Sequence, residues 1–168
     1  MYQSGCAAST KLKLPHNRSY GLTTLEHIFS KKNDLAVTGY SMERVEFISA
    51  SIRSIKEKPA NVFHRLTVDT GEMIQCMEGQ RFLLDDFQTW IPAVDLQQGM
   101  KLAAMHYRID PELPYIEHYA RHTVTVANNE RLALNYSASA YIIRLEEKVA
   151  TLIEVSSHVS VISSSDHR

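Results

Sequence analysis

Strand-forming patterns dominate this sequence and most constrain its fold. Apolar residues either alternate with polar ones or gather in short runs rich in Val, Ile, Thr and Phe, which is typical of β-strands. Such segments include "LAVTGYS", "RVEFISASIRSIKEK", "VFHRLTVDTGEMIQCM" and "RLALNYSASAYIIRLEEKVATLIEVSSHVSVI". In a chain of 168 residues, this density of short strands predicts one mainly-β domain with a closed or strongly coiled sheet.

A few segments depart from the strand pattern. "LTTLEHIFSK" places Leu25, Ile28 and Phe29 at helical spacing behind a capping threonine at 23 or 24, which predicts one short helix. "DTGEM" predicts a hairpin turn, "AVDL" a single helical turn, and Gly99 a turn before the next strand. "DPELPYIEHYARHTVTV" predicts a second helix over 115–122.

Composition argues against several classes of function. The net charge is −1, so no overall field favours nucleic acid or an anionic membrane. No apolar run approaches the roughly 20 residues that span a bilayer, and "MYQSGCAAS" does not have the pattern of a signal peptide. We therefore expect a cytoplasmic protein without nucleic-acid or membrane partners.

The cysteines and histidines do not form a recognisable metal motif. Cys6 and Cys76 are not part of a CxxC motif, and the expected compartment favours two reduced thiols. For Cys76 the strand pattern predicts a buried, unbridged thiol. His118 and His122 have i, i+4 spacing, but "HYARH" lacks the glutamate of HExxH motifs. We expect neither a metal nor a cofactor.

The order of the segments resembles a known family. Cys6 is followed by "AASTKLKL" and "YGLTTLEHIF", then by "VFHRLTVDTGEMIQCMEGQRFLL" and "TWIPAVDLQQGMKL". This order is similar to the N-terminal half of inteins, whose Hint fold is shared with Hedgehog autoprocessing domains. Near the end, "IIRLEEKVATLIEVSSHVSV" looks like the penultimate strands of that family. The resemblance implies a Hint-like horseshoe of coiled β-strands with one or two short helices.

The resemblance also implies a division of the chain. Residues 1–5 correspond to a leader, like the segment that precedes an intein, and residues 6–168 to a single Hint-like domain. Residues 103–140 would be a short insertion, at the place where larger inteins carry an endonuclease domain.

In the family, an autocatalytic acyl shift moves the preceding peptide from a backbone nitrogen to the side chain of a nucleophilic cysteine. Carried over to this chain, the nucleophile is Cys6, the thioester forms at Gly5–Cys6, and the partners are the host sequences that flank the domain. Gln80 occupies the place of the family's histidine, and Met77 that of its threonine. A glutamine can form hydrogen bonds but cannot serve as a general acid near neutral pH.

The C-terminal part departs from the family in a similar way. His158 falls near the family's downstream histidine, and His167 near the histidine that precedes its terminal asparagine. Arg168 stands in place of that asparagine, which would release the downstream chain. A separate C-terminal intein fragment is a further possible partner.

Two functions therefore compete. One is an intein-like protein-splicing domain that is impaired in complete splicing and performs at most a single-turnover cleavage. The other is a non-catalytic Hint-like module with a binding or structural role. Ordinary roles remain open for several residues: a solvated tail for His167, a strand histidine for His158 and a surface turn for Gln80. If the Hint fold is correct, Cys6 lies near Gln80 or His158, and we expect Cys6 to react with thiol reagents faster than Cys76.

Overall fold

The computed structural model describes residues 3–15, 21–31, 36–109, 112 and 117–165. The regular secondary structure of the described chain is antiparallel β-sheet apart from one short α-helix and one 3₁₀ turn, which confirms the predicted mainly-β, Hint-like fold class. The elements are β1 (Cys6–Ala7), β2 (Lys11–Lys13), β3 (Leu22–Thr24), α1 (Leu25–Lys31), β4 (Ala36–Ser41), β5 (Glu46–Val68), β6 (Met73–Cys76), β7 (Arg81–Leu83), β8 (Trp90–Pro92), η1 (Ala93–Asp95), β9 (Lys101–Ile109), β10 (Glu117–Leu145), β11 (Val149–Ser156) and β12 (Val159–Ser163).

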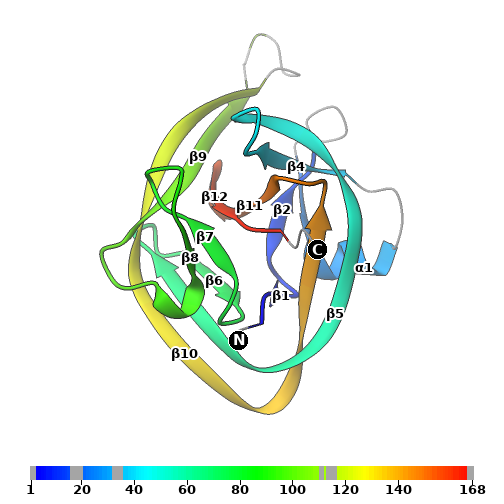
Figure 1. Ribbon diagram of the computed structural model, residues 1–168, viewed down its shortest axis with the longest axis vertical. Helices are drawn as coiled ribbons and strands as arrows, with labels where there is room; N and C mark the ends of the chain where they lie inside the picture. The colour runs from blue at the N-terminus through cyan, green and yellow to red at the C-terminus, as the bar shows by residue number, and fades with distance from the viewer. Residues whose placement is uncertain (1–2, 16–20, 32–35, 110–111, 113–116, 166–168) are drawn as a thin grey trace.

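Two very long strands, β5 and β10, give the molecule its curved outline. They pair with each other and sweep around the other strands, as Figure 1 shows. Their ladder contains three irregularities, next to Val126, Ala133 and Arg144. Irregularities of this kind bend a strand and increase its twist, so strands of 23 and 29 residues can wrap around a core.

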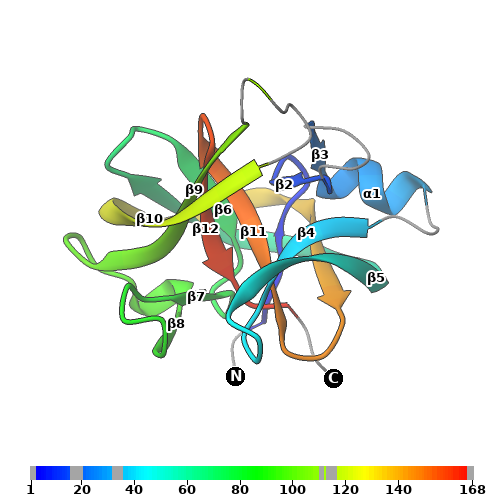
Figure 2. The ribbon, with the colours of Figure 1, turned by 90° about the horizontal axis from the view of Figure 1, so that it is seen from above.

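The strands near the end of the chain form the centre of the fold. β11 pairs with β2, β4 and β12, and β12 pairs also with β7 and β9. Every residue of β12 is buried, and β11 is buried at all but two positions. Burial on both faces means that polar residues such as Thr151 and Ser160 are buried together with their apolar neighbours. Figure 2 shows β11 and β12 running through the middle of the molecule.

Several local predictions are confirmed. α1 begins at Leu25, and the Thr24 hydroxyl caps it by accepting the His27 N–H at 3.2 Å. The 69–73 turn joins β5 to β6, with Gly71 at φ +90°, where glycine is favoured over other residues. The "AVDL" turn is η1.

The predicted helix over 115–122 is wrong for the part that the structure describes. Residues 117–122 are the first part of β10, and they pair with β9 in a regular antiparallel ladder. Of the segment 103–140, expected as an insertion, residues 103–109 belong to β9 and residues 117–140 to β10, and both strands are part of the main sheet. The division of the chain implied by the resemblance stays a prediction. The described helices include none long and apolar enough to cross a membrane.

Candidate functional site

The side chain of Gln80 joins the two ends of the described chain. Its Oε1 accepts a hydrogen bond from the Gly5 backbone N–H at 3.0 Å. Its Nε2 donates to the Ser163 hydroxyl at 2.7 Å and to the Ser164 carbonyl at 2.8 Å. These three contacts, called the Gln80 clip below, use both hydrogens and the oxygen of the amide. They also fix its orientation, because only the oxygen can accept from Gly5 and only the nitrogen can donate to Ser164.

A tight turn between β6 and β7 positions Gln80. The Gln80 N–H donates to the Met77 carbonyl at 3.1 Å, and the Gln80 carbonyl accepts from the Ala93 N–H at 2.8 Å. The side chain is only 6% exposed. Both backbone polar groups of Gln80 are therefore hydrogen-bonded and its side chain is buried. Gln80 is not a residue of a solvated surface turn.

The N-terminal segment lies along this turn. The Gly79 N–H donates to the Gln3 carbonyl at 2.9 Å, and the Ser4 hydroxyl donates to the Gly79 carbonyl at 3.2 Å. One residue further on, the Met77 N–H donates to the Gly5 carbonyl at 2.8 Å. Residues 3–5 therefore pair with 77–80 almost as an added strand.

The Gln80 side chain binds the backbone nitrogen of Gly5. The predicted acyl shift would use the backbone nitrogen of the next residue, Cys6. Gly5 and Met77 form a hydrogen-bonded pair, so the next pair along, Cys6 and Cys76, is not hydrogen-bonded. The N–H and C=O of Cys6 therefore point the other way, toward its β10 partner Tyr141. The Gly5–Cys6 amide nitrogen belongs to the β1–β10 ladder and faces away from Gln80.

Gly5 itself has a conformation that excludes larger residues at this position. Its φ is +141°, and an added Cβ would lie 3.2 Å from the Tyr141 carbonyl oxygen and 3.4 Å from the Met77 sulfur. A side chain here would be strained by its backbone and crowded by its neighbours. The residue whose nitrogen Gln80 holds thus carries no nucleophile.

Cys6 is packed into the core. It is 5% exposed and belongs to the same apolar cluster as Cys76, which is fully buried. Burial raises the pKa of the Cys6 thiol to about 12, so only about one thiol in 10⁵ is ionised at neutral pH. Cys76 is a free, buried thiol, as predicted. Cys6 is slightly more exposed than Cys76, so the expected faster reaction of Cys6 with thiol reagents stays a prediction.

The two predicted histidines do not join this site. His158 lies in the turn between β11 and β12, where its ring packs edge-on against Tyr107 with centroids 5.0 Å apart. Ser163 lies five positions further along the chain, which corresponds to roughly 16 Å of extended strand. His167 lies outside the described residues. The predicted proximity of Cys6 to Gln80 is confirmed, because the residue before Cys6, Gly5, is hydrogen-bonded to the Gln80 side chain. His158 lies away from both residues.

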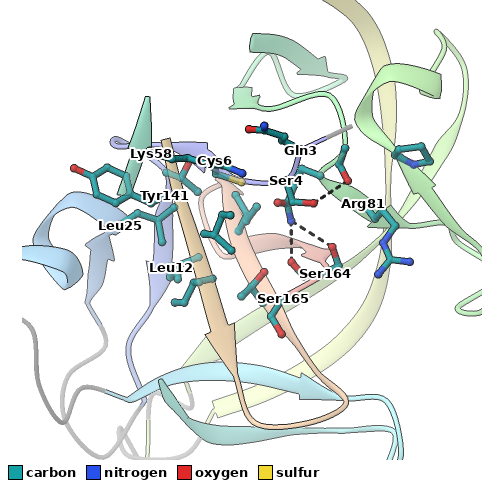
Figure 3. A pocket seen from close by; sticks show the side chains of 18 residues that line it. Gln3, Ser4, Cys6, Leu12, Leu25, Lys58, Arg81, Tyr141, Ser164 and Ser165 are labelled. Carbon is teal, nitrogen blue, oxygen red and sulfur yellow. Dashed lines mark hydrogen bonds between the residues drawn. The ribbon is translucent and has the colours of Figure 1, made fainter. Parts of the chain in front are cut away.

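A cavity of about 650 Å³ adjoins the Gln80 clip, and Figure 3 shows Gln3 and Ser4 lining it together with Ser164 and Ser165. The basic side chains of Lys58 and Arg81 also line it. His158 is not among the described residues around this cavity. Within the described part of the chain, no three His, Cys, Asp or Glu side chains are grouped so that they could hold a metal ion.

Sequence reasoning found Gln80 but missed its C-terminal partners. Nothing in the sequence marked Ser163, Ser164 and Ser165 as part of a site, yet Ser163 is fully buried and Ser165 is 4% exposed. The Ser165 hydroxyl donates to the Val149 carbonyl at 2.7 Å. The signal that could have found them is the strand pattern of residues 159–162, which contains three apolar residues and leads directly into these serines.

Replacing Gln80 by leucine is expected to lower the free energy of unfolding by about 2 kcal/mol. Leucine keeps a similar volume but leaves the Gly5 N–H and the Ser164 carbonyl without partners, and each such loss costs about 1–3 kcal/mol, less where cavity water replaces the bond. Urea unfolding measures the loss. Gln98→Leu, at an exposed position, is the matched control and should change stability by less than about 0.5 kcal/mol. Equal effects of the two substitutions would mean that the clip contributes nothing.

Comparison with known proteins gives structural matches only. No protein-family model and no curated protein sequence matches the chain. A bacterial intein-like domain from Clostridium thermocellum is similar with a TM-score of 0.71 and 16% identity, over 98% of this chain and 99% of that one. A DnaB intein from Synechocystis is similar with a TM-score of 0.72 and 9% identity, over 98% of this chain and 100% of that one. An intein from a hyperthermophile is similar with a TM-score of 0.73 and 12% identity, over 95% of this chain and 99% of that one. The chain therefore has the Hint fold of inteins and intein-like domains over nearly its whole length.

Proposed function

We propose that this protein is a non-catalytic Hint domain, a structural module that holds its two chain ends together without cleaving its own backbone. The observation that carries this proposal is the Gln80 clip, in which one neutral amide binds Gly5 on one side and Ser163 and Ser164 on the other. Polypeptide segments joined to either end would be held side by side, and these segments are the partners of the module.

An acyl shift needs two groups that the site does not supply. The first is a nucleophilic side chain on the residue whose nitrogen is held at the site, and that residue is Gly5. The second is a proton donor for the leaving nitrogen, because an unprotonated amide nitrogen is a poor leaving group. Gln80 accepts a hydrogen bond from the Gly5 N–H and cannot donate a proton to that nitrogen as an acid.

Cys6 does not replace the missing groups in this geometry. Its thiol stays protonated at neutral pH, since burial raises its pKa to about 12. The nitrogen that would leave is its own, and this nitrogen faces the β10 ladder. The proposal therefore favours the second of the two functions inferred from the sequence over splicing or cleavage at Gly5–Cys6.

Intact-mass measurement in the presence of excess small thiol tests this proposal. The thiol would capture any thioester at Gly5–Cys6 and release the first five residues. We expect the wild-type chain and Cys6→Ala to keep their full mass equally well over days. Gln80→His should also stay intact, since it restores a proton donor but no nucleophile at position 5. Release of the first five residues that requires Cys6 would establish residual self-processing and overturn the proposal.

A further inference from the structure

Cys6 and Cys76 are cross-strand neighbours. Cys6 of β1 pairs directly with Cys76 of β6, and the two thiols belong to one apolar cluster. Side chains of residues that face each other in an antiparallel pair project from the same face of the sheet. Consistent with this closeness, the pKa of Cys76 is raised first by burial and then by the neighbouring Cys6. The two thiols are therefore adjacent in space although they are far apart in sequence.

The register places this pair at a position that suits a disulfide bond. Because Gly5 and Met77 form the hydrogen-bonded pair, Cys6 and Cys76 form the non-hydrogen-bonded pair beside it. The Cα atoms of such a pair lie about 4.5 Å apart, with their side chains close together. Disulfides span Cα separations of about 4.4–6.8 Å, so the bond can form without displacing either strand.

We propose that Cys6 and Cys76 form a redox-sensitive disulfide that locks β1 to β6 directly beside the Gln80 clip. The two cysteines are reduced in this structure. Oxidation would add a covalent link where Gly5 and Met77 are joined by one backbone hydrogen bond. This inference goes beyond the proposed function and does not depend on whether the domain processes itself.

The oxidant is a small-molecule disulfide such as oxidised glutathione. Cys6 borders the cavity, whereas Cys76 is fully buried, so the oxidant reaches Cys6 first. The Cys6 thiolate attacks the small disulfide and forms a mixed disulfide, and the released thiolate takes up the proton. The Cys76 thiolate then attacks the Cys6 sulfur and expels the second small thiol. One small disulfide is thereby reduced to two thiols while two protein thiols become one disulfide.

The rate should depend on pH and on access. Burial raises the pKa of both thiols, so few are ionised at neutral pH and the native protein should oxidise slowly. The reaction should quicken as the pH rises, and it should also proceed when the reduced, unfolded chain refolds in an oxidising glutathione buffer. During refolding the oxidant can reach both thiols, so the geometry of the Cys6–Cys76 pair decides whether the disulfide forms.

The test combines mass, thiol counting and thermal unfolding of the full chain after refolding in oxidised glutathione. We expect the mass to fall by two hydrogen atoms, with no glutathione adduct and no thiol alkylated after denaturation. The melting temperature should rise by on the order of 10 °C over the reduced protein, because the bond closes a loop of about 70 residues in the unfolded chain.

Cys76→Ser is the control, since it can form only a mixed disulfide at Cys6. Each protein is compared with its own reduced form, so any destabilisation by the substitution cancels. We expect no rise in the melting temperature of oxidised Cys76→Ser. Free thiols that persist after refolding, stable glutathione adducts on both cysteines of the wild type, or a disulfide-linked dimer would each contradict the proposal. An internal disulfide without a rise in melting temperature would contradict its role as a lock.

Discussion

Replacement of Phe82 by alanine is expected to lower the free energy of unfolding by about 3–5 kcal/mol. The Phe82 side chain is fully buried, and the residue lies between Ile91 of β8 and Ser163 of β12. Truncation removes apolar contacts and leaves a cavity that the surrounding strands cannot fill without moving. Since domains of this kind are stable by about 5–15 kcal/mol, the variant should retain only part of its stability.

Urea unfolding followed by the fluorescence of the only tryptophan, Trp90, measures this loss. Tyr136→Ala is the matched control, because that ring is 63% exposed and its removal should change stability by less than about 0.5 kcal/mol. The loss at Phe82 should also weaken the Gln80 clip, since Ser163 faces Phe82 across the strand pair. Equal stability losses for the two variants would show that β7 is not part of the core.

Replacement of Gly39 by valine is the second change with a large expected effect. Gly39 lies in β4 between Ile48 of β5 and Thr151 of β11. An added Cβ would lie 2.6 Å from a methyl carbon of Val149 and 3.1 Å from the Ala150 carbonyl oxygen. One of these neighbours is backbone and the other a stiff, β-branched side chain, so neither can move aside easily.

We expect Gly39→Val to destabilise the domain by about 3 kcal/mol, the upper end of the usual range for overpacking. This corresponds to a fall in melting temperature of roughly 6–12 °C, which calorimetry would measure. Ser51→Val, at an exposed position of β5, introduces the same side chain into a strand and should change the melting temperature little. An unchanged melting temperature of Gly39→Val would mean that β4 and β11 are further apart than the structure places them.

Local patterns predicted much of the fold because they depend on neighbouring residues. The threonine cap of α1 and the glycine turn at 69–73 are encoded within a few positions. The segment after Ile109 was misjudged because its charged and aromatic residues fit a helical spacing as well as an alternating one. Pairing with β9 along nine residues decides in favour of a strand, and this partner lies outside any local window.

The site was predictable only in part. The order of segments identified Gln80 and brought it near the N-terminal strand. It could not specify which peptide nitrogen Gln80 binds, because a shift of one residue along a strand reverses the direction of every N–H and every side chain. Here a difference of one position decides that Gly5 binds Gln80 while the side chain of Cys6 faces the core. The serines that complete the clip lie 83 and 84 positions after Gln80 and carry no motif of their own.

Backbone hydrogen exchange at residues 5 and 6 tests most directly the claim that Gln80 holds the Gly5 nitrogen. In the wild type we expect both the Gly5 and the Cys6 amides to be protected. In Gln80→Leu, Gly5 should lose its protection under native conditions, while the Cys6 amide, which faces β10, should stay protected once global stability is taken into account. Rapid exchange of the Gly5 amide in the wild type would contradict the clip. Selective loss of protection at Cys6 in Gln80→Leu would place the Gly5–Cys6 peptide at Gln80 instead, and would restore the case for self-processing there.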